Sequence, residues 1–306
     1  MVPLSCRRFR HAPALLALAL VLAASPLRAE DDAPDAPTYP TTEFADGARA
    51  ASVTDAGVTA TVRVERRPKV DANLDVPVLE VTVGGSKVLE KVGVASGMDV
   101  PAASASIAEI DPDNDAREVY FSAYSGGAHC CSQIAIADET PSGWIAIDVG
   151  SFDGDGDYLE DLDNDGVAEI VTVDNAFLYA FDCYACSAAP LRIQGVRGGK
   201  LVDLTAEPRF LPNHREWLQQ LEDDSDPETR WTSPGYLAGW VAASIRAGRG
   251  NAAFQDLLAH WDLGKDQGEE TCLTGADLDA CPAGETKVLK FPDRLRLFLQ
   301  QHGYPI

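Results

Sequence analysis

The sequence predicts a mainly β protein with an α-helical C-terminal part, in which blade-like antiparallel β units are capped by a helical hairpin. Two observations carry this prediction. Between residues 51 and 206, short runs rich in β-branched, aliphatic and aromatic residues recur at spacings of roughly ten residues and alternate with turn signals. From residue 207 onward, the apolar residues recur instead with the period of a helix. The 25 glycines and 19 prolines also favour many turns over long helices.

The first 29 residues have the three parts of a secretory signal peptide. Arg7, Arg8 and Arg10 precede an apolar run at residues 14–24, and small residues lead to a cleavage site after Ala29. The run is shorter than the roughly 20 apolar residues that a membrane-spanning helix needs, although an uncleaved anchor is the alternative. We therefore expect a periplasmic or secreted protein, with no membrane contact after cleavage. Residues 30–50, rich in Pro, Thr, Ala and Asp, are expected to be a disordered linker.

The mature chain is strongly acidic. The whole sequence has 25 basic and 48 acidic residues, and the predicted signal peptide contains four Arg and no acid, which leaves 25 − 4 = 21 basic residues and a net charge of −27. The negative electrostatic field of such a chain repels phosphate backbones and anionic lipids, so nucleic-acid binding and electrostatic docking to a membrane are disfavoured. Cations are the natural small partners of this surface.

Residues 58–65 have the clearest strand pattern, because apolar and polar side chains alternate along them. A period of two places the apolar side chains on one face of a sheet. Further strands are expected at residues 78–83, 119–123, 134–137, 144–149, 170–173, 177–181, 191–196 and 201–204. Turn signals such as Gly84-Gly85 and Gly198-Gly199 separate them, which favours antiparallel pairing. Together they predict a β domain over residues 51–206.

The C-terminal region, residues 207–306, is predicted to be helical. Ser233 and Pro234 are suited to the N-cap and the first position of one helix, and a second helix begins at Asn251. These two helices would form the hairpin that caps the β domain. A last helix is expected at residues 292–302, and Gly303 would end it.

Residues 161–169 are the strongest chemical signal in the chain. Their carboxylates occupy positions 1, 3, 5 and 9 around a glycine at position 6, which permits a sharp turn. Ca²⁺ prefers six to eight hard oxygen ligands, and alternate residues of a tight loop can direct their side chains to one centre. The expected ligands are the side chains of Asp161, Asp163, Asp165 and Glu169 and the backbone carbonyl of Val167.

Two other acidic segments are weaker candidates for a cation. The first is a degenerate copy of the loop, in which Ala116 replaces the glycine and the last acid arrives one residue early; its ligands would be Asp111, Asp113, Asp115 and Glu118. The second lies directly before the main loop and contains Asp153, Asp155 and Asp157. It could hold its own ion, lend ligands to the main site, or be a flexible acidic turn. A fainter echo of the loop occurs at Asp71, Asn73 and Asp75.

The acidic loops, each followed by a strand, resemble the FG-GAP and VCBS repeats of integrin-type β-propellers and secreted bacterial proteins. The resemblance covers roughly residues 71–181. It implies a calcium-stabilised β fold that serves binding or adhesion, and it implies no enzymatic activity. A closed propeller generally needs at least four blades. Because the β region has room for about three, we expect a propeller-like arrangement that is open or sandwich-like.

Six cysteines remain after the signal peptide, and an even number in an exported chain indicates disulfides. Cys272 and Cys281 would close a short loop. Cys130 and Cys131 could cross-link to Cys183 and Cys186, which would join two neighbouring elements. The alternatives are a four-thiolate zinc site and a thiol–disulfide exchange site at Cys183 and Cys186.

These observations favour an exported, non-catalytic calcium-binding protein whose partner is a protein or a glycan. The chain contains no Gly-x-Ser-x-Gly motif, no His-Glu-x-x-His motif and no phosphate-binding glycine-rich loop with lysine. The alternative function is enzymatic. It would be a secreted hydrolase with acidic residues near the calcium loop, or a thiol–disulfide exchange protein.

Overall fold

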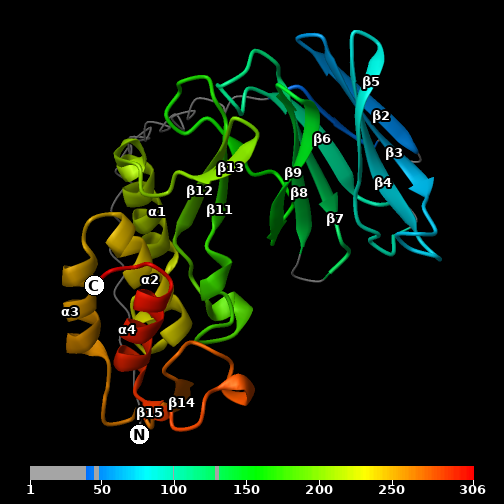
Figure 1. Ribbon diagram of the computed structural model, residues 1–306. Helices are drawn as coiled ribbons and strands as arrows, with labels where there is room; N and C mark the ends of the chain where they lie inside the picture. The colour runs from blue at the N-terminus through cyan, green and yellow to red at the C-terminus, as the bar shows by residue number, and fades with distance from the viewer. Residues whose placement is uncertain (1–38, 45–47, 99, 128–130) are drawn as a thin grey trace, which may run out of the picture. The chain divides into compact units, whose positions relative to one another are not determined.

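The computed structural model describes residues 39–44, 48–98, 100–127 and 131–306. The predicted signal peptide and most of the predicted linker therefore lie outside the described residues. Within them, the chain forms antiparallel sheets followed by a C-terminal part with four α-helices (Figure 1). This confirms the mainly β class with a helical C-terminal part, and the described strands form no closed barrel or propeller.

The first sheet is a four-stranded meander in which each strand pairs with the next one along the chain. Its strands are β2 (Ala50–Asp55), β3 (Val58–Arg66), β4 (Asp75–Val83) and β5 (Ser86–Val92). The predicted alternation holds in β3, where Val58, Ala60 and Val62 are buried. The structure adds β2 and β5, which the sequence did not predict as separate strands.

The second sheet contains five strands in the order β1-β6-β7-β8-β9. Its strands are β1 (Thr41–Glu43), β6 (Ala103–Ala108), β7 (Glu118–Tyr124), β8 (Ser132–Thr140) and β9 (Gly143–Phe152). β1 pairs with β6 and lies inside the segment 30–50. The expectation that this whole segment is a disordered linker is therefore wrong at residues 41–43, where pairing with a sheet edge orders the backbone.

The third sheet is a second four-stranded meander in chain order. Its strands are β10 (Leu159–Glu160), β11 (Glu169–Val173), β12 (Leu191–Arg197) and β13 (Lys200–Asp203). The strand expected at residues 177–181 is wrong. Asp174 caps a short 3₁₀ helix, η1 (Asn175–Phe177), and Tyr179 adopts a left-handed backbone with φ of 64°. The apolar run is thus a turn, and Phe177 and Phe181 are buried in the helical core.

Strand β7 shows why the second sheet holds the β domain together. Val119 and Phe121 lie in an apolar cluster with Val62 of the first sheet. Tyr120, whose side chain points to the opposite face, lies in a cluster with Ile170 of the third sheet. The second sheet therefore has apolar neighbours on both faces, and one acidic loop, at residues 111–115, precedes its strand β7.

The helical part packs around the buried faces of two helices, with Leu237 and Leu257 at its centre. The helices are α1 (Leu211–Asp224), α2 (Pro234–Arg246), α3 (Gly250–His260) and α4 (Phe291–Gln301). The last three match the predicted helices to within a residue at their starts, and Ser233 is the N-cap of α2. The sequence did not predict α1 or the hairpin of β14 (Glu269–Cys272) and β15 (Thr286–Leu289). None of the described helices is long and apolar enough to cross a membrane.

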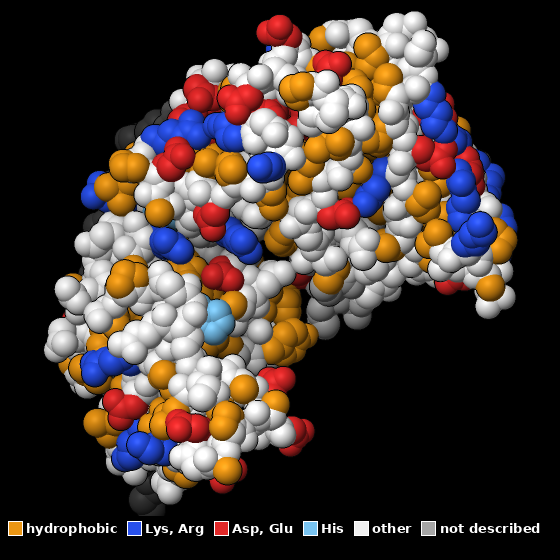
Figure 2. Space-filling view, in the orientation of Figure 1, with side chains coloured by type: hydrophobic (Ala, Val, Ile, Leu, Met, Phe, Trp, Pro, Cys, Tyr) orange, Lys and Arg blue, Asp and Glu red, His pale blue; other side chains and the backbone are white. Residues whose placement is uncertain are grey.

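Figure 2 shows basic and acidic side chains gathered over the first sheet. Arg63 pairs there with Glu80 at 3.0 Å and with Glu90 at 3.2 Å, and Arg67 pairs with Glu90 at 2.7 Å. The basic side chains of this face are therefore matched by acids, so this face is not a one-sided basic patch.

Candidate metal centre

The loop between β10 and β11 wraps around the carboxylate of Asp161. The two oxygens of Asp161 accept hydrogen bonds from the backbone N–H groups of Asp165 at 3.0 Å and Gly166 at 2.9 Å. Asn164 and Gly166 have φ angles of 59° and 88°. This left-handed backbone is costly for most residues and available to glycine and, less readily, asparagine. The sequence Asn-Asp-Gly at this point therefore permits the tight turn that the spacing predicted.

Three carboxylates converge inside this loop. Oxygens of Asp161, Asp163 and Glu169 all lie within 4.8 Å of one another. Glu169 is the first residue of β11 and is 1% exposed. Its Oε2 accepts a hydrogen bond from the backbone N–H of Leu162 at 3.1 Å, whereas its Oε1 accepts none. A buried charged oxygen without a partner is costly, and a cation would remove that cost.

Asp165 does not join this group of three. Its Oδ1 accepts a hydrogen bond from the backbone N–H of Val167 at 2.8 Å, and its Oδ2 lies 3.1 Å from Nη1 of Arg209. The structure thus brings together three of the four predicted carboxylates. The fourth carboxylate, that of Asp165, instead stabilises the turn through its hydrogen bond with Val167.

Arg209 is the residue of this site that sequence reasoning missed. It lies in the 3₁₀ helix η3 (Pro208–Phe210), and its Nη1 donates to Oδ2 of Asp163 at 2.8 Å. Its Nη2 is 3.4 Å from Oε1 of Glu169, which is too long for a good hydrogen bond. This one guanidinium faces the four carboxylates of the loop and also pairs with Glu207 at 2.8 Å, so the loop keeps an excess of negative charge.

The titration behaviour of nearby groups reflects this excess of negative charge. Burial raises the pKa of Glu169 to about 7, and the charges of Asp163 and Asp165 act in the same direction, against the Leu162 N–H and Arg209. Burial, followed by the charges of Asp161 and Glu169, raises the pKa of Tyr39 to about 12. The positive charge of Arg209 therefore does not cancel the effects of burial and of the neighbouring carboxylates on the pKa of Glu169 or of Tyr39.

The degenerate loop before β7 has a different arrangement. Glu118, the first residue of β7, is fully buried, and its Oε2 accepts hydrogen bonds from the backbone N–H groups of Ile110 at 2.6 Å and Asp111 at 2.9 Å. Asp113 and Asp115 are exposed. Among the described residues, the predicted ligands Asp111, Asp113, Asp115 and Glu118 do not form a group of three with mutually close oxygens. This loop is one residue shorter than residues 161–169, so its glutamate is displaced. Its carboxylates therefore do not converge on a common centre in the described structure.

The segment of Asp153, Asp155 and Asp157 is likewise not assembled as a cation site in the part of the chain that the structure describes. Asp155 and Asp157 are exposed, and the backbone points inward. The carbonyl of Gly156 accepts a hydrogen bond from the hydroxyl of Tyr120 at 2.7 Å. A Cβ at Gly156 would lie 2.0 Å from Oγ of Ser122, so glycine is needed for this close approach. Through this hydrogen bond, the backbone of the segment links the second sheet to the start of the third.

The faint upstream echo is not a cation site either. Asp71 accepts hydrogen bonds from the backbone N–H groups of Asn73 and Leu74 at 2.7 and 2.8 Å, as in an ordinary turn. Asp75 pairs with Arg49 at 2.6 Å and with Arg66 at 2.7 Å.

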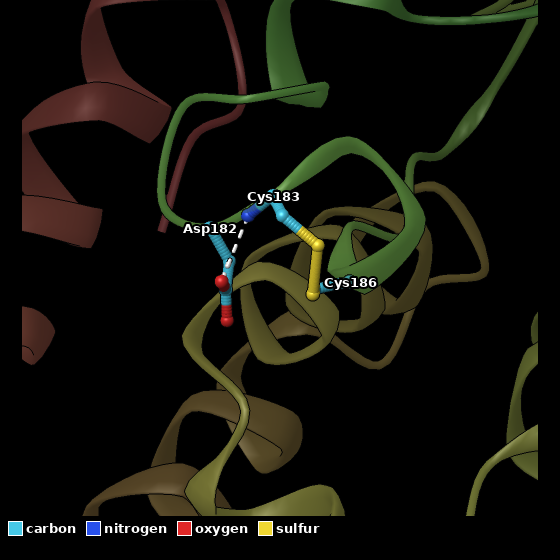
Figure 3. Close-up of side chains that lie close together, drawn as sticks. All are labelled: Asp182, Cys183 and Cys186. Atoms are coloured by element: carbon cyan, nitrogen blue, oxygen red, sulfur yellow. Dashed lines mark hydrogen bonds between the residues drawn. A yellow bond between two sulfur atoms is a disulfide. The ribbon is translucent and has the colours of Figure 1, made fainter. Parts of the chain in front are cut away.

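The cysteines form local disulfides. Cys183 is joined to Cys186, so the expected cross-link from Cys130 and Cys131 to this pair is wrong (Figure 3). Cys131 is also disulfide-bonded, whereas Cys130 lies outside the described residues. Cys272 is joined to Cys281, which gives the short loop expected from the sequence.

Asp182 lies close to the Cys183–Cys186 pair, but the three do not form a metal site while the sulfurs are bonded to each other. The carboxylate of Asp182 accepts a hydrogen bond from the backbone N–H of Cys183 at 2.8 Å (Figure 3).

The loop that follows this disulfide packs closely on α2. A Cβ at Gly239 would lie 2.1 Å from the backbone carbonyl of Ala188, and the N–H of Ala188 donates to the carbonyl of Gly235 at 3.3 Å. Two glycines four residues apart thus give α2 a flat surface on which the loop rests. This packing indicates a structural role for the disulfide.

One cavity lies beside the acidic segments. It has a volume of about 220 Å³, and Glu43, Ser122, Tyr124 and Asp155 contribute to its lining. Binding sites for small molecules usually measure about 300–1,000 Å³. The cavity is therefore small for the sugar or peptide substrate of a hydrolase.

Comparison with known proteins identifies a matching family model and similar sequences. Residues 214–303 match a family model described as the sll0997 C-terminal domain. The chain is 39% identical over 209 residues to the "Probable thylakoid lumen protein sll0997" of Synechocystis sp., an alignment covering 67% of this chain and 61% of that protein. It is 33% identical over 189 residues to the "Uncharacterized protein y4bJ" of Sinorhizobium fredii, covering 61% of this chain and 30% of that protein. No solved structure matches the chain.

Proposed function

We propose that this protein is an exported, calcium-stabilised β protein that serves binding or scaffolding rather than catalysis. The observation that carries the proposal is the buried Oε1 of Glu169, which has no hydrogen-bond donor and faces a cluster with Asp161 and Asp163. The donor set consists of hard carboxylate oxygens, and residues 161–169 contain no His or Cys. That chemistry suits Ca²⁺ better than Zn²⁺ or a soft metal.

The ion's role would be structural. The loop leads directly into β11, and the backbone N–H of Ala168 donates to the carbonyl of Glu109 at 2.7 Å. A cation held by Asp161, Asp163 and Glu169 would stabilise the start of β11 together with this link to the second sheet. Extracellular modules bind calcium with Kd of about 10⁻⁴–10⁻³ M, and binding to the folded state alone adds to its stability.

We also propose that the sheets are blade-like units related to FG-GAP and VCBS repeats. In the second and third sheets, the acidic loop stands directly before a strand, and the strand begins with the buried glutamates Glu118 and Glu169. Both loops also connect the first two strands of a meander, β6 to β7 and β10 to β11. The equivalence of position supports a repeat whose second-sheet copy has lost its cation. By analogy with such repeats, the partner would be a protein or a glycan.

The location we propose is the periplasm or the extracellular space. The basic and apolar leader supports export, and the disulfides fit an oxidising compartment. The similarity to a probable thylakoid lumen protein is compatible with this, because the lumen is also reached by export across a membrane.

Thermal unfolding with and without calcium tests the proposal. We expect EDTA-treated wild type to gain stability on addition of 10 mM Ca²⁺, and Asp163→Asn to lose most of that gain. Asp157→Asn removes an equal charge from the neighbouring exposed segment and should respond to calcium like wild type. Equal responses of wild type and Asp163→Asn would show that the ligand assignment is wrong.

A further inference from the structure

A cavity of about 270 Å³ in the helical part is lined by two tryptophan side chains. Its lining comes from two segments of the chain. One is the 3₁₀ helix η4 (Arg230–Thr232), which contributes Trp231 and Thr232. The other follows α3 and contributes Trp261, Asp262, Lys265 and Asp266. None of these residues belongs to the acidic loop at residues 161–169, so the cavity is a separate site.

Both indole rings are fixed by neighbouring rings. Trp231 stacks on the imidazole of His260, with ring centroids 4.0 Å apart and an angle of 13° between the planes. Trp231 also makes a T-shaped contact with Trp240, at 5.7 Å between centroids. Trp261 packs against Phe291 at 4.5 Å between centroids. Walls that are already in place before a ligand arrives lower the entropy cost of binding.

The charged groups of the cavity carry an excess of negative charge. Its two acids, Asp262 and Asp266, against one base, Lys265, give the lining a net charge of −1. Oδ2 of Asp266 accepts a hydrogen bond from Nε1 of Trp261 at 2.9 Å. Oδ1 of Asp262 accepts one from the backbone N–H of Gly264 at 3.0 Å. These neutral donors position the two carboxylates without cancelling their charge.

Lys265 does not fill the space beside the rings. Its side chain is 88% exposed, and its Nζ lies 3.3 Å from Oδ2 of Asp262. An exposed ion pair of this kind contributes little stability. Another cation can therefore replace Lys265 as the partner of Asp262.

These features select the chemistry of the ligand. The face of an indole ring attracts cations, and Trp does so more strongly than Tyr or Phe. The carboxylates of the cavity and the strongly acidic chain attract cations and repel anions. A cavity of about 270 Å³ lies just below the range of about 300–1,000 Å³ that is usual for small-molecule sites. It therefore suits a compact head group better than a sugar chain.

We propose that this cavity binds a small organic cation that carries a methylated ammonium group. The two indole rings contact the methyl groups, and the carboxylates of Asp262 and Asp266 balance the charge. Quaternary ammonium groups are recognised in this way by aromatic side chains. The proposal goes beyond the calcium-stabilised fold and does not depend on calcium binding at residues 161–169.

Calorimetric titration of the full chain with choline, in EDTA and at constant ionic strength, tests the proposal. Choline supplies a trimethylammonium group, and 3,3-dimethylbutan-1-ol is an uncharged molecule of the same shape. We expect saturable binding of choline at millimolar concentrations. The uncharged alcohol should bind more weakly by about tenfold or more, because it lacks the charge that the rings and carboxylates attract.

Three variants locate the site. Trp231→Leu removes one aromatic wall and should weaken choline binding by about tenfold. Asp262→Asn removes a charge from the lining and should weaken it by about threefold. Asp279→Asn removes an equal charge from an exposed residue outside the lining and should bind choline like wild type. If Trp231→Leu does not fold, Asp262→Asn still tests the site, because Asp262 is exposed.

Four outcomes would overturn the proposal. The first is the absence of choline binding by wild type at 10 mM. The second is equal binding of choline and the uncharged alcohol, which would make the cavity a neutral apolar site. The third is binding of glucose without binding of choline, which would make it a sugar site. The fourth is equal weakening by Asp262→Asn and Asp279→Asn, which would show that choline responds only to the overall charge of the chain.

Discussion

Replacing Glu169 by glutamine should have opposite effects on stability with and without calcium. The substitution keeps the shape of a side chain that is 1% exposed, and it removes the negative charge. Without calcium, the folded state no longer has to bury that charge next to Asp163. With calcium, the protein loses a charged ligand, so the stabilisation by the ion falls. A purely structural glutamate would give the same sign under both conditions.

The magnitude follows from the burial of this carboxyl group. Its pKa is raised from 4.5 to about 7. Each tenfold change in an acid dissociation constant corresponds to about 1.4 kcal/mol, so keeping Glu169 charged at pH 8 costs the folded state about 3 kcal/mol. Glutamine weakens the contacts to Leu162 and Arg209, so we expect a net gain in EDTA of about 1–2 kcal/mol. At 10 mM calcium and a Kd of about 10⁻⁴ M, wild type gains about 2.7 kcal/mol, and most of this should be lost.

Urea unfolding at pH 8, in EDTA and in 10 mM calcium, measures both effects. Glu118→Gln is the matched control, because Glu118 is equally buried, begins β7 and also has a pKa raised to about 7. It belongs to no group of converging carboxylates in the described structure. We expect this control to be insensitive to calcium. Destabilisation of Glu169→Gln in EDTA, or an undiminished response to calcium, would refute the reasoning.

Three further predictions concern residues around the site and in the helical part. Arg209→Gln removes a positive charge that lies 2.8 Å from the expected ligand Asp163. The repulsion between one positive charge and a doubly charged ion is about 2 kcal/mol or more at separations of about 5 Å, so calcium titration should show tighter binding, and weaker binding would contradict the reasoning. Gly239→Ala would place a Cβ 2.1 Å from the carbonyl of Ala188. Overpacking of this kind costs about 1–3 kcal/mol or more in denaturant unfolding, and an unchanged midpoint would contradict the packing of that loop on α2. Burial lowers the pKa of His214, so the folded state binds its proton less tightly and loses stability as the pH falls below about 6.5. His214→Gln should show less of this loss, and an identical pH profile would exclude the effect.

The individual strands and helices could be predicted because hydrophobic periodicity and turn-forming residues are properties of neighbouring residues in the sequence. β3 follows its alternation, and α2 begins at Pro234 after its N-cap. The apolar run at residues 177–181 was wrongly expected to be a strand, because its composition suits one. In the structure, Asp174 caps a helical turn and Tyr179 reverses the chain. Composition does not distinguish a buried strand from a buried turn.

The acidic loop at residues 161–169 could be predicted only as far as its own nine residues allow. Asp161, Asp163 and Glu169 converge as their spacing suggested. Arg209 lies 46 residues from Asp163 and enters the site through tertiary packing, which spacing does not reveal. The information that the sequence lacked was the position of this partner in space, because an arginine in itself is an ordinary residue.

Calorimetric titration of the EDTA-treated protein with Ca²⁺ tests the central claim most directly. Wild type should bind one ion in the loop at residues 161–169, with a Kd of about 10⁻⁴–10⁻³ M, and Asp163→Asn should give little or no binding heat. The absence of binding by wild type at millimolar calcium would contradict the account, as would equal binding by the two proteins.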